Sequence, residues 1–238
     1  MPADPTPDLT PDLTPDLAPG PTPDLAPDLT PGPTPGPTSA DPFRAGVLIE
    51  QEEFERLAVA EPELEGCRFV DCTFRSVTFG AGHGERSSWR GSRLTGVRLT
   101  GTGLARSTWL DTTIEGSALA GCELYGAQLR RVRLERCLLD SLNLRSAVLR
   151  DVVLDDCTVR HLDLGSAKLT DVTFRDCTIE RLDLTAATLS RVDLRGSRLD
   201  IARGLDRLAG ATVDPGQVLD LAPAMALHLG LTVRDARA

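Results

Sequence analysis

The sequence is poor in residues on which catalytic and binding sites commonly depend. Aromatic residues make up 4% of the 238 residues, there are three His, and Lys168 is the single lysine beside 25 arginines. No stretch approaches the ~18 consecutive apolar residues of a membrane span, and the N-terminus lacks the basic and then apolar pattern of a signal peptide. We therefore predict a cytoplasmic protein without a membrane segment, whose six Cys remain reduced thiols.

The N-terminal part differs from the rest in proline content and charge. Residues 7–38 read as eight tetrads of the types PDLT, PDLA and PGPT, and residues 1–40 hold six Asp with no Lys or Arg. Proline at this density removes backbone donors and fixes φ, which predicts a disordered tail over residues 1–40. The tail is either a docking arm or spacer, or a low-complexity extension without a partner. The net charge of −9 is concentrated here, because residues 62–201 carry one excess positive charge.

A hydrophobic residue recurs at every fifth position from Phe54 to about residue 201, with Gly84 as the one exception in thirty. From Leu57 onward, a second small or apolar residue stands two positions before each of these central residues. A period of five fits neither a helix nor a flat strand, but it fits a short extended piece followed by a turn. Both repeated positions then point to the same side. The pattern therefore predicts a repeat architecture whose interior both positions fill.

Residue identities at a spacing of twenty indicate four such units per turn. Cys137, Cys157 and Cys177 are twenty apart, and the same spacing relates series of Leu (142, 162, 182), Ala (147, 167, 187) and Val (132, 152, 172, 192). A three-sided coil would repeat at fifteen instead. We predict a square parallel β-solenoid over residues 54–201, with seven full coils and a length of about 34 Å at the spacing of adjacent strands.

The individual units resemble a known family. LDLTA, VDLRG, LDLGS and LNLRS are similar to the A(D/N)LXX consensus of the pentapeptide-repeat proteins, and CRFVD, CTFRS and VTFRD to its Cys/Phe variant, over about residues 52–201. The resemblance implies an all-β fold, the right-handed quadrilateral parallel β-helix. It also implies a non-enzymatic role. Some members of the family mimic DNA, bind type II topoisomerases such as DNA gyrase, and protect them from quinolones or other poisons.

The segments that flank the repeats predict end structures. Residues 41–53 are expected to form an N-terminal entry and cap, with Val47, Leu48 and Ile49 covering the first coil. Residues 202–238 are expected to form a short helical cap: Asp214 and Pro215 favour a helix start, Pro223 begins or kinks a second helix, and Gly230 ends it.

The C-terminal segment is apolar on more than one side. Its large apolar residues are Val218, Leu219, Leu221, Met225, Leu227 and Leu229. They cover the open end of the solenoid, or they cover it and also pair two subunits into a homodimer. The resemblance supports both readings, because gyrase-binding members dimerise through C-terminal elements and carry a segment similar to GATVDP (210–215).

The sequence shows no constellation of catalytic or metal-binding residues. All six Cys occupy the inward position two before a central residue, where a small buried side chain is expected, and none has a His at ligand spacing. The three His are scattered, and no nucleophile or phosphate-loop motif occurs. We predict no catalytic site, no metal site and no cofactor, and therefore no enzyme.

The charged residues of the outer surface differ between the four faces, whose net charges over residues 62–201 are about −3, +3, 0 and +1. The acidic face is the candidate interaction face, with Glu63, Glu65, Glu85, Glu123, Asp163 and Asp183, interrupted by Arg86, Arg106 and Arg145. The basic face carries Arg68, Arg90, Arg130, Arg131, Arg150, Lys168 and Arg191.

The charges of the four faces decide which functional prediction we place first. A DNA mimic needs a strongly negative face, and the acidic face is only weakly negative. The first prediction is a non-enzymatic protein-interaction module, and the alternative is a DNA-mimicking binder of DNA gyrase that gives tolerance to its inhibitors. Direct binding of nucleic acid is not expected, because stacking aromatics are lacking and the total charge is unfavourable.

Overall fold

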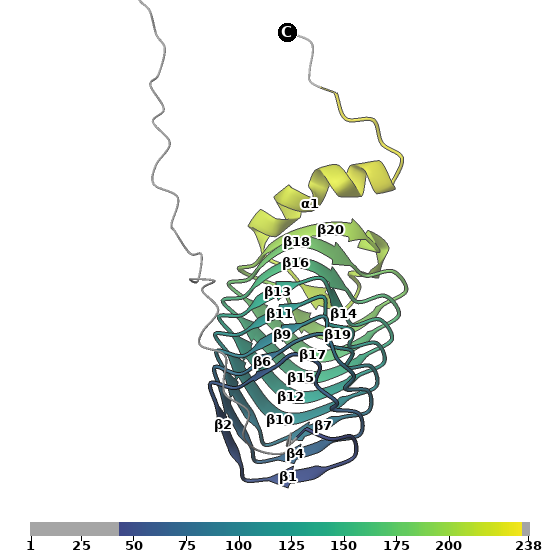
Figure 1. The fold of residues 1–238 in the computed structure, drawn as a ribbon. Helices are drawn as coiled ribbons and strands as arrows, with labels where there is room; N and C mark the ends of the chain where they lie inside the picture. The colour runs from purple at the N-terminus through teal and green to yellow at the C-terminus, as the bar shows by residue number, and fades with distance from the viewer. Residues whose placement is uncertain (1–42, 235–238) are drawn as a thin grey trace, which may run out of the picture. The chain divides into compact units, whose positions relative to one another are not determined.

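A computed structural model of the chain describes residues 43–234. These residues form a parallel β-solenoid of about eight turns, followed by one short helix (Figure 1). The predicted tail over residues 1–40 lies outside the described residues. Within the described part, no helix is long and apolar enough to span a bilayer.

The strands stack into two sheets, and within residues 43–234 neighbouring strands of each sheet pair in parallel. The first sheet contains β1 (Leu48–Glu50), β2 (Glu53–Glu55), β4 (Arg68–Val70), β5 (Thr73–Arg75), β7 (Ser88–Arg90), β8 (Arg93–Thr95), β10 (Thr108–Glu115), β12 (Gln128–Glu135), β15 (Val148–Asp155), β17 (Lys168–Arg175), β19 (Thr188–Asp193) and β21 (Ala211–Thr212). The second contains β3 (Ala58–Val59), β6 (Thr78–Phe79), β9 (Arg98–Thr100), β11 (Ala118–Ala120), β13 (Leu138–Asp140), β14 (Leu142–Asn143), β16 (Thr158–Asp163), β18 (Thr178–Asp183) and β20 (Arg198–Arg203).

The register between neighbouring turns is twenty residues, as the identity pattern predicts. Trp89 pairs with Trp109, Trp109 pairs with Leu129, and Leu129 pairs with Leu149. The four faces are therefore the basic face (central residues 69, 89, 109 and onward by twenty), a third face (74, 94), a fourth face (79, 99) and the acidic face (64, 84). The expected seven coils were too few, because Ile49 already has the five-residue phase and β1 pairs with β4.

The last residue of most quintets is the corner, and it adopts the left-handed conformation. Asp111 has φ of 52°, Arg131 also has φ of 52°, and Gly91 has φ of 62°. Asp and Gly tolerate this region, which accounts for their frequency at corners. At Gly84, the exception at the central position, the Leu104 side chain of the next turn occupies the space that a larger residue would fill: a Cβ there would lie 2.8 Å from the Leu104 Cδ2 atom.

The N-terminal end of the interior is closed by Phe43, which was not singled out from the sequence. Its side chain is fully buried, and its ring centroid lies 5.1 Å from that of Phe54 and 5.3 Å from that of Phe79. The expected cover was Val47, Leu48 and Ile49. Of these Ile49 is buried, whereas Leu48 is about half exposed, because alternate residues of an extended strand point to opposite sides.

The C-terminal end is covered by a 3₁₀ turn, η1 (Leu205–Arg207), and a single helix, α1 (Pro215–His228). Pro223 lies inside α1 and does not begin a second helix. Asp214 and Gln217 form a reciprocal capping box at the start of α1. The Gln217 side chain also donates to the carbonyl oxygens of Leu194 and Ser197 at 2.5 and 2.6 Å, which ties the helix to the last turn.

Candidate functional site

The structure brings the predicted acidic residues together in two neighbouring columns on the acidic face. Glu63, His83, Gly103, Glu123 and Asn143 follow one another through parallel bridges. The same column continues through Asp163 and Asp183. Glu65 and Glu85 lie two positions further along their quintets, in the adjacent column. The face is therefore a real surface feature, although His83 and Gly103 separate its first acid from the others.

Most of these carboxylates have partners within the chain. Arg86 pairs with Glu65, an Arg145 nitrogen lies 3.3 Å from the Asp163 carboxylate, and the Asn143 amide donates to Glu123. Among residues 43–234, Glu63 and Glu85 are the two members of the predicted set whose side chains have no hydrogen bond or ion pair. A face on which cations cover the acids presents little net negative charge, so its geometry is unlike that of a DNA mimic.

Asp183 differs from the solvated position that the sequence suggested for it. The residue is 6% exposed. Burial works against its ionisation, yet hydrogen bonds from the Thr185 amide and hydroxyl and the cations Arg203 and Arg145 keep the pKa of Asp183 below its usual value. The Arg203 Nε atom is 3.0 Å from this carboxylate. Asp183 therefore stabilises the end of the ladder and is not available to a partner.

The acidic face contains a polar hollow of about 400 Å³ beside Glu63 and His83 and a shallower one of about 200 Å³, in which two of the predicted acids converge. The smaller hollow is lined by Glu123 and Asp163 together with Ser141, Leu142, Asn143 and His161. The His161 Nδ1 atom lies 3.4 Å from the Ser141 hydroxyl. Both groups stand at coil corners, so the hollow is the boundary between the fourth and acidic faces. It offers hydrogen-bonding groups of both kinds to a polar partner.

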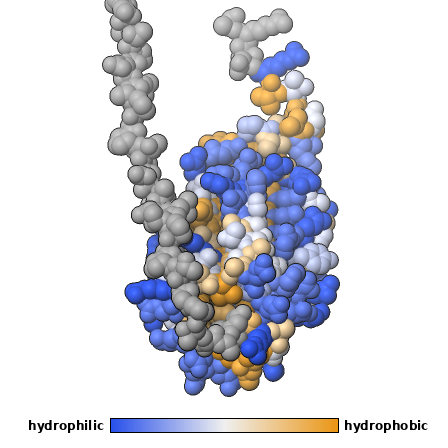
Figure 2. Space-filling view, viewed as in Figure 1, coloured by the Kyte–Doolittle hydropathy of each residue, from blue (hydrophilic) through white to orange (hydrophobic). Residues whose placement is uncertain are grey.

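The six predicted residues of the C-terminal segment divide into two sets. Leu221 is buried against the solenoid and Met225 is half-buried. Val218, Leu219, Leu227 and Leu229 are exposed, with values of 45%, 75%, 78% and 72%. Leu219 is offset by about half a helical turn from Gln217 and Leu221, which face the last coil. The outward side of α1 is therefore apolar, and Figure 2 shows hydrophobic surface on this segment.

The six Cys are all buried and unpaired, at the inward positions that the repeat assigns to them. On the fourth face, the Sγ atoms of Cys137, Cys157 and Cys177 lie 3.4 to 3.5 Å from carbonyl oxygens of the preceding turn. Burial raises the pKa of Cys122 to about 11, and the hydrogen bond with Cys137 raises the pKa of Cys157 to about 12. Over residues 43–234, no group of three or more His, Cys, Asp or Glu is placed to hold a metal ion.

Three residues that shape these surfaces were missed from the sequence. Asn143 and Arg203 complete the ladder of the acidic face, and Gln217 attaches α1. The first two follow from a signal in the sequence, because each stands twenty residues after the acid that it contacts. Nothing in the spacing of Gln217 predicts that its amide reaches the last turn.

Comparisons with known proteins bear on the repeat itself. A family model described as "Pentapeptide repeat region" matches residues 127–203. Comparison with curated protein sequences gives no match. Among solved structures, full-length QnrB1, a plasmid-mediated fluoroquinolone resistance protein, is similar at 12% identity and a TM-score of 0.31, over 75% of this chain and 99% of that chain.

A second solved structure is HetL, a pentapeptide repeat protein involved in heterocyst differentiation regulation in the cyanobacterium Nostoc. It is similar at 17% identity and a TM-score of 0.27, over 72% of this chain and 91% of that chain. Identities and TM-scores this low indicate nothing about what this chain binds.

The region matched by the family model and the turns before it have the same register and the same inward positions. The twenty-residue register of β12, β15 and β17, inside or overlapping the match, is the same as that of β1, β4 and β7 before it. The inward central and preceding residues are buried in both parts. Residues 127–203 are therefore a pentapeptide-repeat region, and the turns before them share its construction.

Proposed function

We propose that this chain is a non-enzymatic protein-interaction module, in which the solenoid is a rigid support and the outer surface carries recognition. The observation that carries the proposal is the outward side of α1, where exposed leucines stand at the end of a rod whose other large apolar residues are mostly inward. The six free thiols support a reducing compartment, and we assign the chain to the cytoplasm.

The first surface in this proposal is the apolar side of α1, which pairs two copies of the chain. A terminal cap of a solenoid normally presents a polar outer side to water. Here Leu219 and Leu227 occupy it, and Asp220 is the one formally charged residue of the helix. Contiguous exposed apolar surface of this kind is typical of an interface. A homodimer buries these side chains and leaves the four faces free for other partners.

Light scattering coupled to size exclusion tests this pairing. The monomer has a mass of 25.5 kDa, and we expect twice that value for the wild-type chain. The double variant Leu219→Asp with Leu227→Asp should elute with the monomer mass. Leu138→Asp is the matched control, because Leu138 is 42% exposed but lies on the fourth face. A wild-type mass of one chain, or dissociation by the control variant, contradicts the dimer.

The second surface is the acidic face, where Glu63, Glu85 and Glu123 are exposed and Glu123 also lines the hollow at His161. We assign it to a protein partner that supplies polar and cationic groups. Replacing these three glutamates by Gln should reduce capture of that partner from cell extract. The variant Glu50→Gln with Glu53→Gln, in the first turn, is the control, and it should capture the partner as the wild-type chain does.

The alternative function is binding of DNA gyrase as a DNA mimic. It is favoured by the resemblance, because gyrase-binding members of the family dimerise through C-terminal elements and carry a segment similar to GATVDP (210–215). The pairing of Asp163, Asp183 and Glu65 with arginines opposes it. A supercoiling assay with purified gyrase separates the two. We expect no inhibition and no protection from a quinolone at micromolar protein, and either effect would establish the alternative.

A further inference from the structure

The basic face carries five exposed cations that have no partner within residues 43–234. We call them the basic strip: Arg68, Arg90, Arg130, Arg150 and Lys168. None of the five appears in an ion pair or a side-chain hydrogen bond of the described chain. On the other faces many arginines are paired, as Arg175 is with Asp155 and Arg160 with Asp140. Half of the unpaired cations over residues 62–203 therefore lie on this one face, and the others, Arg93, Arg98, Arg106, Arg181 and Arg198, are divided among the other three faces.

The ladder stacks these cations along the solenoid axis. Arg130 and Arg150 are in register on adjacent turns, about 4.8 Å apart at the backbone. Arg90 stands in the same column two turns from Arg130, with Leu110 between them. Lys168 lies in the column on the other side of the central residues, in register with Val148. Like charges directly opposite each other destabilise a sheet, so this stack has a cost in the free chain.

Two acids of the adjoining corner column are engaged by arginines of that column, whereas Asp71 and Asp151 there have no side-chain hydrogen bond or ion pair within residues 43–234. Asp111 accepts two hydrogen bonds from the Arg131 guanidinium, and Asp171 accepts two from Arg191. Arg90 and Arg130 are close enough to contribute to the lowered pKa of Asp111, yet no nitrogen of either pairs with it. The corner column thus holds four Asp against two Arg, and its two unpaired Asp offset part of the charge of the strip beside it.

We propose that the basic strip is the docking surface for an acidic peptide segment, bound in an extended conformation along the solenoid axis. This inference rests on the proposed role as an interaction module and adds a surface and a partner chemistry. Arg68 and Lys168 are five turns apart, about 24 Å, which is the length of about seven extended residues. Carboxylates on alternate residues of such a segment face the sheet and pair with the guanidinium groups.

The surroundings of the strip favour a short acidic peptide over nucleic acid. Within the described residues the exposed large aromatic side chain is Tyr125, which lies on the acidic face, so bases have no stacking platform on the strip. Glu50, Glu52 and Glu53 stand in the first turn, at one end of the strip. A continuous polyanion that extended beyond the strip would meet these acids, whereas a peptide of the proposed length ends before them.

Fluorescence anisotropy with a labelled peptide tests the proposal on the full chain. The probe is an eight-residue peptide of alternating Glu and Thr, and the matched neutral peptide has Gln in place of Glu. The variant Arg130→Gln with Arg150→Gln removes the centre of the strip. The variant Arg106→Gln with Arg181→Gln is the control, because both of these arginines are exposed and unpaired but lie at corners of the acidic and fourth faces. A second host chain with the six Asp of residues 1–40 replaced by Asn keeps those acids out of the comparison.

We expect the strip variant to lose about tenfold or more in affinity, and the control variant to change by less than about twofold. Raising NaCl to about 0.5 M should weaken binding of the Glu peptide by a similar factor, and the neutral peptide should not bind. Absence of binding, or equal losses in the two variants, overturns the proposal. Tighter binding of an octathymidylate that also requires Arg130 and Arg150 overturns it in favour of nucleic acid. The mass measurement on α1 is independent of these residues, so it tests the interaction module separately.

Discussion

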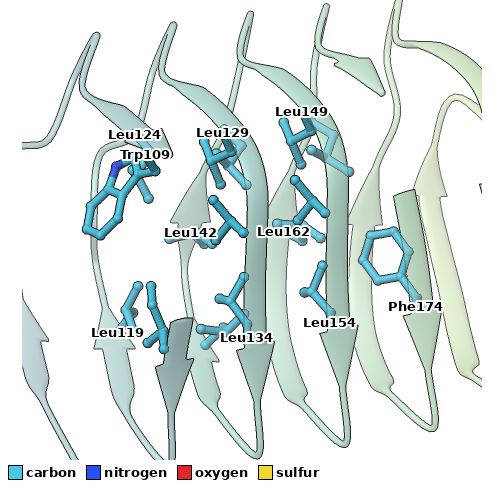
Figure 3. Close-up of a pocket in the computed structure, with 16 residues that line it drawn as sticks. Trp109, Leu119, Leu124, Leu129, Leu134, Leu142, Leu149, Leu154, Leu162 and Phe174 are labelled. Carbon is cyan, nitrogen blue, oxygen red and sulfur yellow. The ribbon is translucent and has the colours of Figure 1, made fainter. Parts of the chain in front are cut away.

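The first and later turns of the solenoid have the same backbone but different interiors. From Phe43 to Trp109 the interior is a column of rings: Phe69 and Trp89 have centroids 4.2 Å apart, and Trp89 and Trp109 stack at 4.9 Å with an interplanar angle of 3°. Beyond Trp109 the interior is aliphatic until Phe174. A cavity of about 40 Å³ lies in this second region, lined by apolar side chains from Trp109 to Phe174 (Figure 3).

The residues beside the rings differ as well. Ser87 and Ser107 stand two positions before Trp89 and Trp109, and each hydroxyl accepts a hydrogen bond from the indole N–H, at 3.2 and 2.9 Å. From Ala127 to Val192 the same inward position holds Ala, Val, Cys or Leu. A buried indole needs an acceptor, so the large ring and the small hydroxyl are one packing unit. The repeat therefore specifies the tube, and pairs of inward residues specify how well it is filled.

The largest effect is expected from removing a ring at the centre of the aromatic column. Trp89→Ala loses both stacked neighbours and leaves the Ser87 hydroxyl without its donor, which should cost about 3–5 kcal/mol of unfolding free energy. Trp109→Ala should cost less, because Trp109 faces the cavity on one side. Chemical denaturation of both variants measures the difference. Equal losses would mean that the cavity does not loosen the packing around Trp109.

Replacing a buried leucine by the larger phenylalanine should change the free energy of unfolding in opposite directions in the aliphatic turns and in the aromatic column. Leu149→Phe adds atoms beside the cavity and should raise the unfolding free energy by about 0.5–1 kcal/mol. Leu94→Phe, between Phe74 and Ile114 in the ladder, should lower it by about 1–3 kcal/mol, because the packed ring column has no such space. Both leucines are buried, and equilibrium denaturation compares them directly. A loss for both substitutions would show that the cavity cannot accept a ring.

The predictable part of the molecule is the part that the period fixes. Period five and register twenty gave the coil, the buried Cys column and the four faces, because each follows from counting along one chain. The same count, applied to charges, would also have paired Asp111 with Arg131 and Asp171 with Arg191, each twenty apart. Counting along the repeat could not predict the roles of Phe43 and Gln217. Each acts once, at an end where the repeat stops, and only coordinates show which side chain reaches the last layer.

A smaller loss of stability is expected at high pH, and it comes from a buried thiol in the aliphatic turns. Burial raises the pKa of Cys122 to about 11, above the ~8.5 of an exposed thiol. A group whose pKa is raised by folding contributes stability that is present below the unfolded value and lost as pH rises toward the folded value. The melting temperature should therefore fall between about pH 8.5 and pH 11. Thermal unfolding across this range measures it, and Cys122→Ala should have a shallower decline. Parallel curves for the two proteins would contradict the assignment.

The smallest effect on stability is expected at the C-terminal end of the solenoid. Polar groups attach the cap there, whereas the N-terminal end is closed by the ring of Phe43. Backbone N–H groups of Gly196 and Gln217 hold the pKa of Asp214 below its usual value. A lowered pKa stabilises the attachment of α1 above about pH 4, and this contribution is lost as pH falls further. Circular dichroism at the helical wavelength should decline below that pH before the β signal changes. Asp214→Asn keeps an N-cap acceptor and should remove this early decline. Phe43→Leu should instead lower the melting temperature by a similar amount at pH 3 and pH 7, because the rings of Phe54 and Phe79 that Phe43 contacts do not titrate. Simultaneous loss of helix and β signals in acid would show that α1 is integral to the ladder and does not detach separately.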